Sequence, residues 1–114
     1  MRVSELTGAA LDWAVAKCEG ATDEWHSYKP FFWHGVACIC MGGHDVDYTP
    51  STDWAQGGPI IERERITVIA MPNGSWATST PLHTFHNPTP LIAAMRCYVA
   101  SKLGDEVEVP EELK

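Results

Sequence analysis

The sequence predicts a single α+β domain in which helices pack on a small antiparallel sheet. Residues 7–18 and 89–103 carry apolar side chains at helical spacing, whereas residues 65–80 have the pattern of a β-hairpin. The chain of 114 residues has the length of one domain, and its 45% hydrophobic and 20% charged content is typical of a globular protein. Strands and helices do not alternate regularly, which argues against a parallel sheet.

The first helix is expected over residues 7–18. Thr7 is a suitable N-cap, and Gly20 is a suitable stop. The apolar residues between them form one helical face, which we expect to be buried: Ala10, Leu11, Ala14, Val15 and Cys18.

The segment from residue 21 to residue 50 is the least regular part of the chain. Its first half is crowded with aromatic rings and histidines: Trp25, His26, Tyr28, Phe31, Phe32, Trp33 and His34. The apolar run 36–41 is compatible with a short buried strand that ends at Gly42-Gly43, and a polar loop is expected over 44–50. A long loop in a small domain is usually functional or covers another part of the fold.

Residues 52–64 predict an interrupted helix. Ser51 and Thr52 can cap it, and Asp53 favours the positive end of the helix dipole. Gly57-Gly58-Pro59 then breaks the pattern, because proline fits the first turn of a helix better than its interior. We therefore expect a short capped turn followed by a second helix start at Pro59.

The clearest strand signal is a hairpin near residues 66–71 and 75–79. Its first arm is rich in β-branched residues, and Asn73-Gly74 between the arms tolerates the positive φ angles of a tight turn. Residues 81–88, which include His83 and His86, are expected to form a loop.

A second strong helix is expected over residues 89–103. Thr89 caps it, Pro90 occupies its first position and Gly104 ends it. A broad apolar stripe predicts a buried face, with these members: Leu91, Ile92, Met95, Val99 and Leu103, flanked by Ala94 and Tyr98.

The formal net charge of −7 argues against non-specific binding of nucleic acid. Five of the fifteen acidic residues lie in the tail 105–114, which is expected to be exposed, with Val107, Val109 and Leu113 as docking points. No apolar run approaches the roughly 18 residues of a membrane span. Residues 1–5 lack a signal-peptide core, so we expect a cytoplasmic protein with four reduced cysteines.

Three blocks of the sequence resemble the NinX-type proteins of lambdoid phages and prophages. The blocks are Leu6–Ala16, then Tyr48–Trp54 followed by Gly57–Glu62, and finally Pro88–Arg96 with Leu103–Pro110. They cover most of the chain in order, and residues 24–47 between them are the variable part. The resemblance implies a small phage accessory protein with helices packed around a sheet, acting in the cytoplasm of an infected bacterium. It implies no established activity.

The sequence gives only weak support for a metal site and for a catalytic cysteine. Cys38 and Cys40 are separated by one residue, not by the two to four usual in structural zinc sites, even if His44, His83 and His86 are added. The same cysteines with His34 or His44 resemble a nucleophile and base, but nothing supplies an oxyanion hole or an orienting carboxylate. We expect no metal, no cofactor and no enzymatic activity.

A phosphate loop is not predicted either. Gly42-Gly43 and Gly57-Gly58-Pro59 lack the lysine and the spacing of a P-loop. The segment 50–54 leads into a helix start, which suits an anion, but Asp53 there would oppose one, so capping is the favoured role.

The aromatic segment and the central motif are the functional candidates, because large rings beside polar groups suit stacking on a flat ligand such as a base. The rings can equally cover the sheet, and both alternatives stay open. The candidate ligand-binding residues are Trp25, Trp33, His34, Tyr48, Ser51, Thr52, Asp53, Trp54, Gln56, Arg63 and Arg96.

Two functions fit these features. The first is a non-enzymatic, homo-oligomeric binding protein that sequesters a small ligand, such as a nucleotide immune signal, or a host factor, and so counters host defence. Its cations would come from Arg63, Arg65 or Arg96. The alternative is a protein–protein interaction module that modulates a host or phage protein through the acidic tail and exposed aromatic residues.

Overall fold

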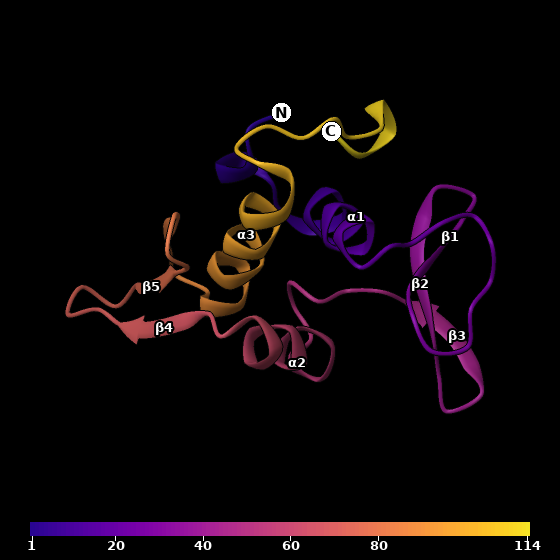
Figure 1. Cartoon of the computed structure of the whole chain (residues 1–114), viewed down its shortest axis with the longest axis horizontal. Helices are drawn as coiled ribbons and strands as arrows, with labels where there is room; N and C mark the ends of the chain where they lie inside the picture. Colours follow the sequence, from indigo (N-terminus) through magenta and orange to yellow (C-terminus); the bar gives the residue numbers. More distant parts are fainter.

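The computed structural model describes residues 1–114 and confirms the α+β class. Its three helices are α1 (Gly8–Cys18), α2 (Trp54–Glu64) and α3 (Pro90–Leu103). The strands form two separate antiparallel sheets: β1 (Phe31–Trp33), β2 (Val36–Met41) and β3 (His44–Asp47), then β4 (Thr67–Ala70), β5 (Trp76–Ser79) and β6 (Thr84–Asn87). The helices occupy the middle of the molecule, and the two sheets lie at opposite ends of it (Figure 1).

The first sheet is a correction, because only β2 was expected in this segment. β1, β2 and β3 follow one another through two-residue turns at His34-Gly35 and Gly42-Gly43, all four residues having positive φ. Two consecutive positive φ angles make a tight hairpin turn whose twist matches the strands. Gly42-Gly43 therefore joins β2 to a further strand, and the polar segment 44–47 is that strand.

Helix α2 is continuous, although a break at Pro59 was expected. The Asp53 side chain caps it by accepting a 2.9 Å hydrogen bond from the amide of Ala55, which confirms the capping role favoured for Asp53, whereas neither Ser51 nor Thr52 is the N-cap. Pro59 lies inside the helix. Gly57 lies against the carbonyl of Pro50 and the side chain of Leu91. The segment Gly57-Gly58-Pro59 has low helix propensity, but it is helical here and α2 packs closely on α3 at this point.

Helix α3 is the centre of the core. It packs on α1, α2, β5 and β6, and it is buried around most of its circumference, as expected of a central helix. The predicted core positions Leu91, Met95 and Val99 are confirmed, whereas Leu103 at the end of the helix is exposed.

The predicted hairpin is confirmed as β4 and β5, which pair from Thr67 with Ser79 to Ala70 with Trp76. The expected loop 81–88 instead contains β6, whose Phe85 lies opposite Thr78. Thr78 is fully buried, and its Oγ1 lies 3.2 Å from Sγ of Cys97 on α3. Helix α3 therefore covers one face of this sheet. Proline and histidine around a four-residue strand concealed β6 in the sequence.

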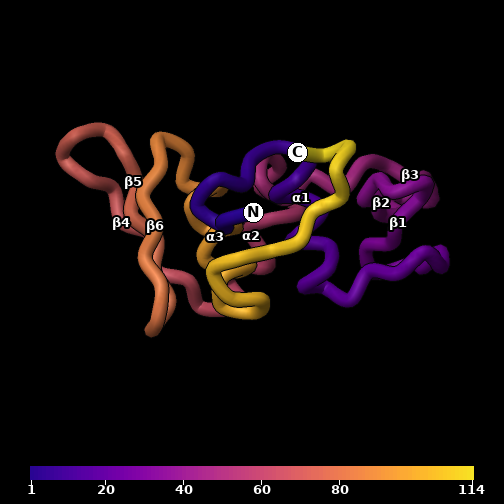
Figure 2. Tube along the Cα trace, turned by 90° about the horizontal axis from the view of Figure 1, so that it is seen from above, coloured from indigo at the N-terminus to yellow at the C-terminus, as the bar shows by residue number.

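The C-terminal tail is docked along the N-terminal segment. The amide of Val3 donates to the carbonyl of Asp105, and the amide of Val107 donates to that of Met1, both at 2.9 Å. Val107 and Val109 are buried, as expected of docking points, and Figure 2 shows the tail running beside the N-terminus.

The approach of α2 to α3 gives a test of this packing. A Cβ added at Gly57 would lie 2.3 Å from the carbonyl oxygen of Pro50 and 2.6 Å from Cδ1 of Leu91. We expect Gly57→Ala to lower the free energy of unfolding by roughly 1–3 kcal/mol, as overpacking does. A Cβ added at Gly58 would have a Trp54 carbon at 3.9 Å as its one neighbour within 4 Å. Gly58→Ala should therefore raise the free energy of unfolding by up to about 1 kcal/mol.

Urea denaturation of both variants measures these changes. Equal stability of Gly57→Ala and Gly58→Ala would show that α2 and α3 are not in close contact.

Candidate functional site

The sheet β1–β3 has one face toward the helices and one face toward solvent. Phe32 points inward and stacks on Trp13 of α1 with ring centroids 5.8 Å apart. Its neighbours on β1 point the other way, because side chains alternate along a strand. The strand register places Phe31 beside Cys38 and Cys38 beside Asp47, so these three side chains share the outward face.

Trp25 lies over this outward face. Its indole nitrogen donates a 3.0 Å hydrogen bond to Oδ1 of Asp45, and its ring centroid is 6.4 Å from that of Phe31. The amide of Phe32 donates to the carbonyl of Thr22, which holds the start of the Trp25 loop beside β1. This cover explains why Phe31 is only 2% exposed although it faces away from the helices.

A pocket of about 300 Å³ lies between Trp25, Trp33 and the outward face of the sheet. We call it the aromatic pocket, and its lining consists of Asp23, Trp25, Phe31, Trp33, Cys38, Asp45, Val46 and Asp47. The two tryptophans are 56% and 64% exposed, and no basic residue lines the pocket.

The thiol of Cys38 lies in the aromatic pocket. Burial raises its pKa above the ordinary value, and the nearby carboxylates of Asp47 and Asp45 raise it further. The thiol is therefore protonated at neutral pH, and its hydrogen bond goes to the carbonyl of Val36 and not to a histidine. All four cysteines are free, as predicted, and no group of three or more His, Cys, Asp or Glu residues is arranged to hold a metal ion.

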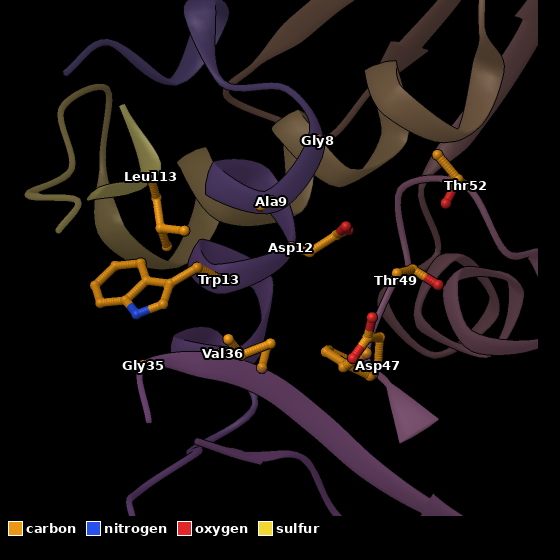
Figure 3. A pocket seen from close by; sticks show the side chains of 12 residues that line it. Gly8, Ala9, Asp12, Trp13, Gly35, Val36, Asp47, Thr49, Thr52 and Leu113 are labelled. Atoms are coloured by element: carbon orange, nitrogen blue, oxygen red, sulfur yellow. The ribbon is translucent and has the colours of Figure 1, made fainter. Parts of the chain in front are cut away.

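A second pocket, of about 250 Å³, lies between α1, β2 and the central motif; we call it the helix pocket. Figure 3 shows Trp13 and Leu113 on one side of it and Thr49 and Thr52 on the other, with Asp12 between them. The tail thus contributes Leu113 to the lining.

Asp12 ties the helix pocket to the central motif. Its Oδ1 accepts a 2.9 Å hydrogen bond from the amide of Ser51. Burial raises the pKa of the Asp12 carboxyl, and the hydrogen bonding from Ser51 partly offsets that rise. The residues around this pocket supply carboxylates at Asp12 and Asp47 but no cation.

A third hollow, of about 230 Å³, lies between β2 and α2 and includes Tyr48, Gln56 and Arg63. Arg63 is engaged there: its guanidinium donates to Glu19 at 2.7 and 3.1 Å and to Glu64 at 2.9 Å. The hydroxyl of Tyr98 also hydrogen-bonds Glu19. These contacts join the ends of α1 and α2 to α3, so the charge of Arg63 is already compensated.

The central motif is mostly structural. Tyr48 and Ser51 are buried, and the side-chain oxygen of Gln56 accepts a hydrogen bond from the amide of Thr49. Thr52 is exposed at the helix pocket, whereas Trp54 is 54% exposed and lines none of the pockets described above.

The remaining candidates are placed as follows. Arg96 is buried, its pKa is lowered by burial, and its Nε donates at 2.9 Å to the carbonyl of Leu6, so it holds the N-terminal segment on α3. His34 occupies the β1–β2 turn, with its ring 4.6 Å from that of Trp33.

The structure therefore brings Trp25 and Trp33 together at the aromatic pocket and Tyr48, Gln56 and Arg63 together at the third hollow, but it does not gather the predicted set into one site. Sequence reasoning missed the residues that complete the aromatic pocket: Asp23, Phe31 as a lining residue, Cys38, Asp45 and Asp47. Asp45 and Asp47 lie opposite Cys40 and Cys38, so both aspartates are on one face of the sheet. This pattern indicates the aromatic pocket only once the β2–β3 hairpin is recognised.

Comparison with known families gives one match: residues 2–102 fit the family described as Bacteriophage P22, NinX. No curated protein matches the chain. None of the helices combines the length and hydrophobicity required to cross a membrane.

Asp12 allows a test of the buried carboxylate. Because its pKa is raised above the ordinary 3.8, protonation favours the folded state, and the resulting stability is lost as pH rises through the folded-state pKa. Asp12→Asn keeps an acceptor for Ser51 and removes the charge. We expect it to be at least as stable as the wild type at about pH 7, with a smaller fall in stability above about pH 4.

Thermal unfolding across this pH range is the measurement. Asp12→Ala is the control, because it leaves the Ser51 amide without its acceptor at a cost of about 1–3 kcal/mol. If Asp12→Asn lost as much stability as Asp12→Ala at neutral pH, the charge itself would be required for folding.

Proposed function

The chain belongs to the bacteriophage P22 NinX family, and we propose that it is a phage accessory protein that binds a partner and catalyses no reaction. It acts in the cytoplasm of the infected bacterium. The binding site is the aromatic pocket on the outward face of β1–β3. The observation that carries this proposal is the pair of exposed tryptophans, Trp25 and Trp33, that line that pocket.

Exposed tryptophans of this kind favour a binding role. Each exposed indole leaves apolar surface in water, and removing that surface from water favours association with a partner. Tryptophan is also enriched at the energetic centres of interfaces. Trp25 is held over the sheet by Asp45, so part of the pocket is preformed before a partner arrives.

The distribution of charge favours a protein partner over a nucleotide. A bound phosphate needs a free cation at the site, yet Arg63 is paired with Glu19 and Glu64, and Arg96 is buried against the chain itself. Arg65, the third candidate cation, lines none of the three pockets described above. The lining of the aromatic pocket supplies three carboxylates and no cation. The alternative deduced from the sequence, an interaction module for a host or phage protein, is therefore the form of the proposal that the geometry supports best.

We also propose that copies of the chain associate through the sheet β4–β6. No Asp, Glu, Lys or Arg occurs from Ile66 to Met95, whereas the chain as a whole carries a net charge of −7. Ile69 on this sheet is 52% exposed. β4 and β6 are edge strands without the charged residues that usually discourage edge-to-edge pairing. This is the region where two acidic copies can meet without charge repulsion.

The partner site is tested by alanine variants of the tryptophans. We expect Trp33→Ala and Trp25→Ala to lose at least tenfold in partner capture from infected-cell lysate, about 1.4 kcal/mol. Trp54→Ala should retain capture, because Trp54 is equally exposed but lies outside the pocket. Quantitative mass spectrometry of the captured proteins is the readout, with circular dichroism as the check of folding. Equal capture by folded Trp33→Ala and wild type would exclude this site.

Self-association is tested by size-exclusion chromatography with light scattering. The wild type should be an oligomer, and Ile69→Lys should shift it to the 12.6 kDa monomer. Leu103→Lys, which changes an exposed leucine on α3, is the matched control and should stay oligomeric. A monomeric wild type, or an Ile69→Lys variant that remains oligomeric, would contradict the proposed interface.

A further inference from the structure

The walls of the aromatic pocket have the chemistry of a cation-binding cage. The faces of indole rings carry negative electrostatic potential and attract a cation placed within about 6 Å of the ring centroid. Trp25, Trp33 and Phe31 all line the cavity. Aromatic residues line the pocket together with Cys38 and Val46, so a ligand there would be partly removed from water.

The acidic residues around these walls strengthen the attraction. Asp23, Asp45 and Asp47 come from two separate elements, the loop before β1 and strand β3, and all three line the cavity. The salt bridges of the structure include none of these three carboxylates. The negative field reaches the interior of the cavity, since Asp47 and Asp45 both raise the pKa of the Cys38 thiol there.

The arrangement of Asp45 favours a planar cation. Its Oδ1 is held by the Trp25 indole at 3.0 Å, which fixes the carboxylate beside the aromatic wall. A planar guanidinium can stack flat on an indole face while the N–H groups at its edge donate to carboxylates, whereas a tetrahedral ammonium group cannot stack flat or donate in this planar, bidentate way. The cavity of about 300 Å³ has the size needed for one such side chain.

We propose that the aromatic pocket binds the guanidinium of an arginine exposed on the partner protein, with Trp25 and Trp33 flanking it and Asp45 and Asp47 accepting its hydrogen bonds. This assignment rests on the proposed function, because it names the chemistry that the partner presents to the same site. An anionic partner group is disfavoured by the three carboxylates. A neutral group would leave their charges without a counter-charge.

The experiment uses two blocked tripeptides, glycine-arginine-glycine and its citrulline counterpart, added to the full-length ¹⁵N-labelled protein. Citrulline keeps the shape and planarity of arginine but lacks the charge. The five tryptophans give five indole N–H signals, so each site reports separately. We expect the arginine peptide to shift the Trp25 and Trp33 signals, with a dissociation constant on the order of 1 mM or tighter. The signals of Trp13, Trp54 and Trp76 should stay in place.

Charge is tested by the double variant Asp45→Asn/Asp47→Asn, which keeps oxygen acceptors in place. It should weaken arginine binding by about tenfold, because neutral acceptors lose the charge-assisted part of the hydrogen bonds. Asp105→Asn, whose side chain is 82% exposed and lies outside the aromatic pocket, is the control and should bind as the wild type does. The citrulline peptide should bind at least tenfold more weakly than the arginine peptide.

The outcomes separate this inference from the proposed function. Equal binding of the two peptides, or no shift of Trp25 and Trp33 by millimolar arginine peptide, overturns the arginine assignment. In either case the binding role itself stands if Trp33→Ala still loses its partner from lysate. Shifts of the same two signals by adenosine monophosphate, with none by the arginine peptide, would also overturn the assignment and restore a nucleotide ligand. If folded Trp33→Ala kept both peptide binding and partner capture, the arginine assignment and the proposed function would both be refuted.

Discussion

The burial of α3 is the constraint on which the rest of this structure depends. A helix enclosed by α1, α2 and the sheet β4–β6 contributes more residues to the hydrophobic core than any other element, and it sets where each of these elements can lie. Gly57 packs against the side chain of Leu91, Thr78 contacts Cys97, and Tyr98 and Arg63 both hydrogen-bond Glu19. Helix α3 thus fixes the position of α2, of the second sheet and of the end of α1.

The same constraint leaves surfaces uncovered. Three helices in a chain of this size cover only one face of each sheet, so both sheets turn a face to solvent at opposite ends of the molecule. The face of β1–β3 is acidic and aromatic, whereas β4–β6 lacks charged residues. On this separation of chemistry we base the proposal that one end receives a basic partner and the other meets a second copy.

Sequence patterns predicted the parts of the fold that local physics determines. The helical spacing around α1 and α3 and the Asn73-Gly74 turn were sufficient, because each element carries its own periodicity or turn signal. They failed where tertiary packing decides: at Pro59, where packing on α3 overrides helix propensity, and in the short strands β1, β3 and β6. The pocket was half predicted, since Trp25 and Trp33 stand out by composition but the aspartates join them only through strand register.

The central claim is that the outward face of β1–β3 receives the partner inside the infected cell. Photo-crosslinking tests it most directly, with a benzoylphenylalanine placed at position 33 or at position 54 of the chain during infection. Both positions are exposed tryptophans, but only Trp33 lines the aromatic pocket. We expect a covalent adduct with a second protein from position 33 and none from position 54. No adduct from position 33, or an adduct from position 54 alone, would show that the partner binds elsewhere.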